Sequence, residues 1–160
     1  MSHVFAIDPG SSETGWVLMD ANDMRPSDFG IMDNETFIGY LKAQVVKMLD
    51  AMFVCEKIVA QGMIEKKQVM ETCQFTGRIQ EVCDPVFVPR REVKMWHCGT
   101  PAAKDSNVIA ALVARYGDKK DKYSKGTKKD PGIFYGFKDD IWQAYAVGAW
   151  YIESERAQGL

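Results

Sequence analysis

The sequence contains no run of eighteen consecutive apolar residues, so no segment has the composition of a transmembrane helix. Its first residues, Met1 to Asp8, lack both the basic flank and the long apolar region of a secretory signal peptide. We therefore expect a cytoplasmic protein that has no membrane partner.

Cysteine and histidine are scarce. The cysteines are irregularly spaced and form no CxxC pair, and only His3 and His97 are available to complete a zinc site. This pattern argues against structural zinc, and small apolar side chains in a reducing compartment account for the cysteines. We assign no chemistry to the four of them, which are Cys55, Cys73, Cys83 and Cys98.

Internal repeats and low-complexity linkers are also missing. With 160 residues, 46% hydrophobic and 26% charged, the chain has the values of an ordinary globular protein. This composition excludes disordered, collagen-like and disulfide-scaffold classes. We expect residues 1–160 to form a single domain with one core.

The charge is unevenly distributed, although the net charge is only −2. Residues 1–88 carry 7 Lys and Arg against 13 Asp and Glu, whereas residues 89–129 carry 11 against 4. A basic segment on an acidic body predicts a polyanionic partner bound by one face. A solvated lysine-rich loop is the alternative interpretation.

The hydrophobic pattern predicts an α/β fold with a five-stranded mixed sheet flanked by helices. Strands are expected at 4–8, 16–20, 29–32, 53–58 and 86–88. Helices are expected at 35–51, at 66–82 after a turn at Gly62, at 89–94, at 101–116, and from 137 or 138 to about 155. The first three strands should form an antiparallel meander, and the crossover through the first helix favours parallel pairing of the fourth strand with the first. We expect 117–136 to be a loop too polar and glycine-rich to pack.

Three carboxylates stand at element ends that this topology brings together. Asp8 closes the first strand, Glu56 lies within the fourth, and either Asp139 or Asp140 opens the last helix. Clustered carboxylates repel one another unless a divalent cation neutralises them, so the pattern predicts Mg²⁺ or Mn²⁺. Two such ions activate water and stabilise the leaving oxygen of a phosphodiester, which is nuclease chemistry.

Each acid also has a structural alternative when it is taken singly. Asp8 can be a turn former, Glu56 an edge-strand charge, and the acids that open the last helix favourable partners of its dipole. Glu56 argues against these alternatives, because a carboxylate inside an apolar strand is costly without a partner.

The segment Ile7-Asp8-Pro9-Gly10-Ser11-x-x-Thr14-Gly15 resembles the opening motif of the RuvC-type Holliday junction resolvases, in the ribonuclease H-like superfamily. The resemblance extends over about residues 4–153. It continues through Glu56, Gly77, Val93-Lys94 before Gly99, Ala103-Lys104-Asp105, and Asp140 before Ala144-Tyr145-Ala146-Val147. The phage-encoded branch is most similar, through Glu56 to Met63, Glu71-Thr72-Cys73 and Lys128 to Gly136. A phage protein of this kind would act in the bacterial host cell.

An Asp-x-Gly-Ser/Thr turn also opens the sugar-kinase and actin-like ATPases. Those proteins need two such domains and a much longer chain, and this sequence has no later adenine-binding glycine motif. We therefore expect no nucleotide cofactor.

The resemblance implies a ribonuclease H-like fold in which Asp8, Glu56 and Asp140 are catalytic ligands of two Mg²⁺ or Mn²⁺ ions, with Asp8 bridging the pair. The family usually has a further Asp one helical turn beyond the third ligand, and that position is Gln143 here. A neutral carbonyl oxygen ligates magnesium more weakly than a carboxylate does. Either Gln143 holds the second ion loosely, or Asp139 or Asp105 substitutes.

DNA contact is expected from the helix at 101–116 and from the lysine-rich loop, whose charges can neutralise phosphates while Ser106 and Thr127 add neutral hydrogen bonds. The predicted DNA-binding residues are Lys104, Asn107, Lys119, Lys120, Lys122, Lys125, Lys128 and Lys129. The resemblance also implies a homodimer, with the helix at 66–82 as interface, whose two active sites meet two strands of a four-way junction.

These expectations combine into one hypothesis. The chain is a metal-dependent endonuclease that resolves Holliday junctions and related branched DNA by phosphodiester hydrolysis. One alternative is a broader nuclease that trims Y-forks and other branches during phage genome packaging. Another is a protein that binds DNA junctions without cleaving them, which the incomplete acidic set at Gln143 favours.

Overall fold

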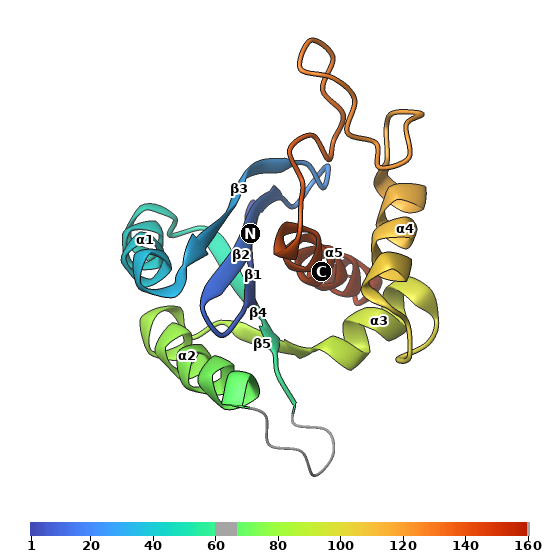
Figure 1. Ribbon diagram of the computed structural model, residues 1–160. Coiled ribbons are helices and arrows are strands. Elements are labelled where there is room, and N and C mark those ends of the chain that lie inside the picture. Colours follow the sequence, from blue (N-terminus) through green and yellow to red (C-terminus); the bar gives the residue numbers. More distant parts are fainter. Residues whose placement is uncertain (60–66, 160) are drawn as a thin grey trace.

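A five-stranded sheet forms the centre of the molecule (Figure 1). The computed structural model describes residues 1–59 and 67–159. The strands are β1 (His3–Pro9), β2 (Glu13–Asp20), β3 (Pro26–Asp33), β4 (Ala51–Lys57) and β5 (Val86–Pro89), in the spatial order β3-β2-β1-β4-β5. β1, β2 and β3 pair antiparallel, whereas β4 pairs parallel with both β1 and β5. The predicted α/β fold with a mixed five-stranded sheet is confirmed.

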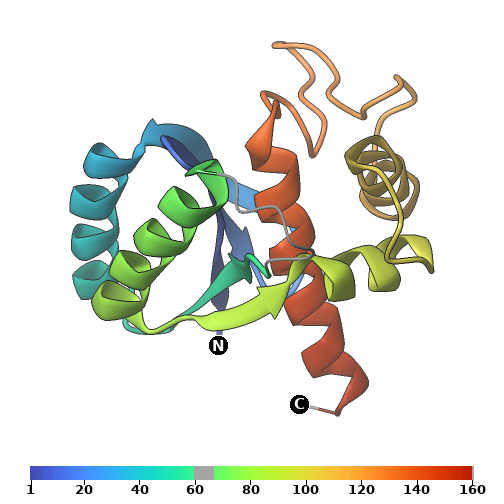
Figure 2. The same ribbon diagram turned by 60° about the horizontal axis from the view of Figure 1, so that its bottom comes forward.

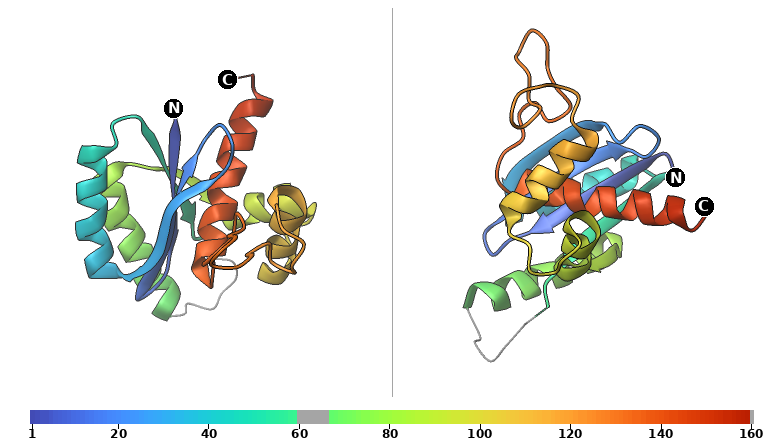
Figure 3. Two further views of the ribbon diagram at one scale, coloured as in Figure 1. Left: turned by 90° about the horizontal axis from the view of Figure 1, so that it is seen from above. Right: turned by 90° about the vertical axis from the view of Figure 1, so that its right-hand side faces the viewer.

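Helices cover both faces of this sheet. They are α1 (Asn34–Lys47), α2 (Lys67–Cys83), α3 (Arg90–Cys98), α4 (Asp105–Tyr116) and α5 (Asp140–Ala157). α1 and α2 lie on one face, and α5 lies on the other with α3 and α4 packed outside it (Figure 2; Figure 3). Over the described part of the chain, no helix combines the length and the apolar character that crossing a membrane requires.

Strand alternation divides the core into two halves. On β1, Phe5 and Ile7 belong to the cluster beneath α1 and α2, whereas Val4 and Ala6 belong to the cluster beneath α5. Asp8 continues the even-numbered series. Its side chain therefore leaves β1 on the face that α5 covers.

α5 lies directly on the sheet because small residues line the contact. A Cβ added at Gly148 would overlap the sulfur of Met19 and come within 3.0 Å of the Cβ of Ala6. Tyr145 is fully buried in the same helix, and its hydroxyl donates a hydrogen bond of 2.9 Å to the carbonyl of Met24. This close contact fixes the position of α5 along the sheet, and therefore the place where the helix begins.

Some helix boundaries differ from the predicted ones. The first helix ends at Lys47 and not at 51, because the Met48 amide closes it on the Gln44 carbonyl and Ala51 already pairs with His3 in the sheet. The helix predicted over 89–94 continues to Cys98. The helix predicted from 101 begins at Asp105, and the predicted turn at Gly62 lies outside the described residues.

The segment 117–136 is a loop, as predicted, but the expectation that it would not pack is wrong. Ser124 is fully buried, and its hydroxyl accepts hydrogen bonds from the amides of Asp118 and Lys119 at 2.7 and 2.8 Å. Phe134 is also fully buried, with its ring centre 4.8 Å from that of Trp142 on α5. The loop is thus anchored on the beginning of α5 while its lysines remain outside.

Glu153 joins the three helices of the α5 face. Its carboxylate accepts hydrogen bonds from Trp96 Nε1 of α3 at 2.7 Å, from Arg115 Nη1 of α4 at 3.0 Å, and from the Tyr116 hydroxyl. Glu153→Ala leaves all three donors without this partner, so we expect a loss of about 2 kcal/mol in the free energy of unfolding. Urea denaturation measures it, with Glu155→Ala on the same helix as a control that changes stability by less than about 0.5 kcal/mol. Equal losses in the two variants would contradict the role of the network.

Candidate active site

The first candidate ligand, Asp8, is held by the turn that follows β1. Thr14 is fully buried and its hydroxyl donates a hydrogen bond of 2.8 Å to Asn34 Oδ1, while Asn34 Nδ2 donates one of 3.1 Å to the carbonyl of Gly10. Asp8 pairs across the strands with Gly15. The threonine of the opening motif therefore fixes the turn directly after the aspartate.

Glu56 comes from the neighbouring strand at the level of Asp8. The parallel register pairs Ile7 with Cys55, so the next residue on each strand is Asp8 and Glu56 respectively. Both face α5, and they are only 6% and 4% exposed. The partner that a buried strand carboxylate needs is Arg90, whose Nε lies 2.7 Å from Glu56 Oε1.

Asp140 reaches the same region from the first residue of α5. It packs against Gly15, where an added Cβ would lie 2.7 Å from the backbone carbon and oxygen of Asp140 and 2.8 Å from its Cβ. Because Gly15 is the cross-strand neighbour of Asp8, the missing side chain allows Asp140 to approach the end of β1. Asp8 is therefore flanked by Glu56 on β4 and by Asp140, which lies over β2 on the same face of the sheet.

The charges of Glu56 and Asp140 act on Asp8. Burial, together with the charge and hydrogen bond of Glu56 and the charge of Asp140, holds the pKa of Asp8 well above its usual value. Burial and the neighbouring Asp139 raise the pKa of Asp140, and Arg90 opposes both shifts. A site with this excess of negative charge has the oxygen donors that Mg²⁺ and Mn²⁺ prefer.

The donor set fits a hard divalent cation in its chemistry. However, no three Asp, Glu, His or Cys side chains within 1–59 and 67–159 are placed so that they could hold a metal ion together. The Arg90 guanidinium contacts one oxygen of the Glu56 carboxylate. Metal ligation by Asp8, Glu56 and Asp140 therefore requires these side chains to move towards one another.

The structure distributes the remaining acidic-site candidates around this group. Gln143 is buried one turn after Asp140 on α5. Asp139 is exposed at the N-cap of α5, with a φ of 44° that only glycine adopts readily. Asp105 lies on α4, with its Oδ1 3.9 Å from Nζ of Lys94, and its charge acts on Arg90.

The predicted DNA-binding residues lie at the beginning of α4, with Lys104 as its N-cap, and on the anchored loop. Asn107 caps α4, because its Oδ1 accepts a hydrogen bond of 2.9 Å from the amide of Lys104. Lys119 Nζ lies 2.9 Å from Asp130 Oδ1. The ammonium groups of Lys122 and Lys125 lie 5.2 and 5.5 Å from the ring centre of Tyr123. The exposed members of the predicted set are Lys104, Asn107, Lys120, Lys122, Lys128 and Lys129.

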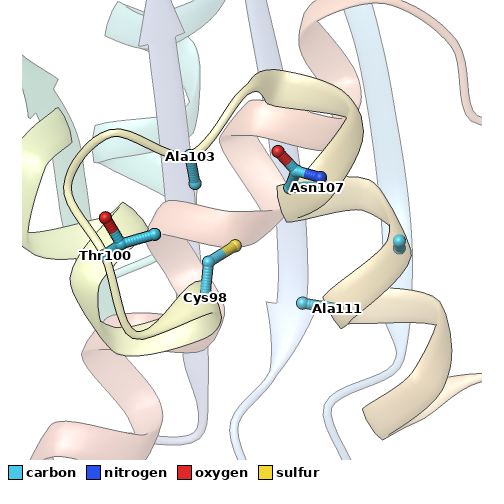
Figure 4. A pocket seen from close by; sticks show the side chains of 6 residues that line it. Cys98, Thr100, Ala103, Asn107 and Ala111 are labelled. Carbon is cyan, nitrogen blue, oxygen red and sulfur yellow. The ribbon is translucent and has the colours of Figure 1, made fainter.

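A pocket lies between the end of α3 and α4 (Figure 4), and none of the candidate carboxylates lines it. Small, neutral side chains line it, namely Cys98, Thr100, Ala103, Asn107, Ala110 and Ala111. No titratable acid or base other than the Cys98 thiol lines it. The candidate chemistry therefore belongs to the group around Asp8 and not to this pocket.

Sequence reasoning missed two residues of the site. Arg90 falls within the helix expected at 89–94 and was given no role in the site. Its position two residues after Val88, which pairs with Glu56, places it near that carboxylate. Asn34 directly precedes the helix expected at 35–51 and was given no role in the site, but its side chain holds the turn after Asp8. For Arg90 the strand register would have been a usable signal.

Solved structures of the same fold are known. The chain is similar to Thermus thermophilus RuvC, with a TM-score of 0.60 and 16% identity over 96% of each chain. It is also similar to T. thermophilus RuvC in complex with a Holliday junction substrate, with a TM-score of 0.63 and 15% identity over 99% of this chain and 97% of that one. No protein-family model and no curated protein matches the sequence. The likeness shows that the chain has the fold of RuvC.

Proposed function

We propose that this protein is a divalent-metal-dependent endonuclease that cleaves four-way DNA junctions and related branched DNA. The observation that carries the proposal is the convergence of Asp8, Glu56 and Asp140 from β1, β4 and α5 on one face of the sheet, where burial and mutual repulsion raise the pKa of Asp8. The RuvC-like fold supports it, since one solved structure of that fold is RuvC with a Holliday junction substrate.

The roles of the side chains follow from their order in space. Asp8 lies between Glu56 and Asp140, so these three carboxylates together would hold the divalent cations. Bound Mg²⁺ or Mn²⁺ would activate water and stabilise the leaving oxygen of the phosphodiester. Two of the carboxylates come from adjacent, hydrogen-bonded strands, which limits how far they can separate. The exposed lysines of 117–129 would neutralise phosphates of the DNA arms.

Cleavage of defined DNA substrates tests this function. Purified protein is incubated with a labelled four-way junction, a Y-fork and a linear duplex, each with Mg²⁺, Mn²⁺ or a chelator. We expect symmetric, metal-dependent nicks in the junction. Equal cutting of the junction and the fork would favour the broader debranching nuclease, and junction binding without nicks in any metal would contradict the proposal.

Symmetric nicks need two active sites, and the homodimer stays a prediction. On α2, Phe75 and Ile79 are buried against the rest of the fold, whereas Met70, Cys73 and Gly77 are exposed. This is the helix that the resemblance assigns to the interface.

A second candidate function is junction binding without cleavage. It is favoured by the neutral Gln143 and by the ion pair that engages Glu56.

If the proposed site is active but weakly ligated, Gln143→Asp adds a carboxylate one turn from Asp140 and should increase Mg²⁺-dependent cutting about tenfold at limiting metal. Gln158→Asp, which adds the same charge at the exposed end of α5, is the matched control. An unchanged rate would show that another acid, such as Asp139 or Asp105, already supplies the ligand.

A further inference from the structure

Arg90 places a protein cation on one of the candidate metal ligands. Its Nε lies 2.7 Å from Oε1 of Glu56, and the Glu56 side chain is only 6% exposed, whereas that of Arg90 is 46% exposed. The charges of Asp8 and Asp105 also act on the guanidinium. Arg90 is therefore the cation that neutralises a buried carboxylate of the site.

The backbone dictates this placement. Val88 of β5 pairs with Glu56 of β4, and both face α5. Pro89 continues the extended chain with φ −62° and ψ 137°, so Arg90 follows two residues after Val88, where the alternation of a strand returns to the same face. α3 begins at Arg90, which anchors the residue at a junction of strand and helix.

The guanidinium uses only part of its bonding capacity on Glu56. Among the described residues, Arg90 makes one ion pair within 4.0 Å, at Nε, and its side chain is 46% exposed. The two Nη groups of the guanidinium are further donors. The planar fork of an arginine matches two oxygens of a phosphate group. A phosphate of the DNA backbone is thus a chemically suitable second partner.

We propose that Arg90 is a built-in counter-ion that neutralises Glu56 in the DNA-free protein, competes there with the divalent cation, and turns to a backbone phosphate when DNA and metal bind. The inference rests on the proposed nuclease function. Arg90 is a positioning residue in the free protein, because it acts through Glu56. DNA binding and metal binding then favour each other. A phosphate that binds Arg90 frees Glu56 for the cation, and a cation that binds Glu56 frees Arg90 for the phosphate.

Metal binding by the DNA-free protein tests the competition. Mn²⁺ is titrated into the wild type and into Arg90→Gln, and free Mn²⁺ is followed by electron paramagnetic resonance. Removal of a positive charge next to Glu56 should tighten Mn²⁺ binding about tenfold. Arg91→Gln, which removes the adjacent exposed arginine, should bind Mn²⁺ like the wild type. Equal or weaker Mn²⁺ binding by Arg90→Gln would overturn the proposal.

Thermal unfolding separates competition from a purely structural role. In chelator, Arg90→Gln should melt below the wild type, because Glu56 has lost its partner. Saturating Mn²⁺ should raise the melting temperature of Arg90→Gln more than that of the wild type. A deficit of equal size with and without Mn²⁺ would mean that Arg90 serves the fold alone, and it would overturn the exchange. Arg90→Lys keeps the positive charge and is less disruptive, so its melting temperature in chelator should lie between those of the wild type and Arg90→Gln.

Single-turnover cleavage tests the second partner. At saturating Mn²⁺ and saturating junction, Arg90→Gln should cut about 100-fold more slowly than the wild type. An unchanged rate would overturn the transfer of Arg90 to phosphate.

The two proposals can fail separately. The Mn²⁺ titration requires no cleavage, so a wild type that cuts no DNA would refute the nuclease function while the comparison of Arg90 variants still tests the counter-ion. A wild type that cuts junctions together with unaltered Mn²⁺ binding in Arg90→Gln would refute the counter-ion alone. If neither protein bound Mn²⁺, both proposals would fall.

Discussion

Replacing Asp8 by asparagine is expected to abolish metal-dependent cleavage while making the metal-free protein more stable. Asparagine has nearly the shape of aspartate but cannot contribute a negative charge to a cation, so we expect cleavage to fall by at least about a thousandfold. In chelator the same change removes a buried charge that faces Glu56 and Asp140. Relief of that repulsion should raise the free energy of unfolding by roughly 1–2 kcal/mol at neutral pH.

The pH dependence of this stabilisation has a definite sign. Burial, followed by the charge of Glu56, raises the pKa of Asp8 in the folded protein well above the ordinary value of 3.8. The contribution of Asp8 to stability is therefore fully present below that ordinary value and is lost as the pH rises towards the raised pKa. In chelator, Asp8→Asn should match the wild type near pH 4 and exceed it increasingly at higher pH.

Urea denaturation between pH 4 and pH 8 measures the difference. Asp28→Asn, which removes an exposed carboxylate from β3, is the matched control and should follow the wild type at every pH. Saturating Mn²⁺ should reverse the order, because the wild type gains binding free energy that Asp8→Asn largely lacks. Parallel curves in chelator, or a variant less stable than the wild type at pH 7, would contradict the interpretation of Asp8.

The placement of the carboxylates was predictable because it follows from strand geometry. Asp8 and Glu56 end or interrupt apolar runs, and a crossover helix between their strands favours parallel neighbours. A parallel register then puts both residues at one edge of the sheet, where the structure places them. Asp140 was one of two predicted alternatives, and the beginning of α5 together with Gly15 identifies it as the acid that packs next to the site.

Features that depend on packing between distant segments could not be predicted in the same way. The loop at 117–136 has the polar, glycine-rich composition of a segment without a core, yet Phe134 packs against Trp142 and Ser124 holds the loop together from inside. The first helix ends early because the Asp50 carboxylate accepts a hydrogen bond from the Ser2 amide and β4 must begin beside β1. Composition averages over a segment, whereas these outcomes depend on single contacts.

Gly15 shows most clearly that the position of a site residue depends on packing between distant segments. Gly15→Ala is expected to lower the free energy of unfolding by about 3 kcal/mol, because the new Cβ would lie 2.7 Å from the backbone carbon and oxygen of Asp140. No rotamer change relieves a clash between a Cβ and a backbone. α5 must shift away from β2 at its first turn, and Asp140 then moves away from Asp8.

Gly39→Ala is the matched control, since a Cβ at Gly39 on α1 meets nothing within 4 Å. Alanine is the better helix former there, so the free energy of unfolding of this variant should rise by up to about 1 kcal/mol.

Under conditions in which Gly15→Ala remains folded, its cleavage rate should fall about 100-fold, because a ligand displaced by about an ångström costs a rate factor of that order. Circular dichroism gives the stability and junction cleavage gives the rate. If Gly15→Ala melted with the wild type and cut at the same rate, Asp140 would not owe its place to Gly15. A loss of cleavage that exceeds the loss of folded protein would instead mean that the spacing of Asp8 and Asp140, and not stability alone, requires a glycine at this position.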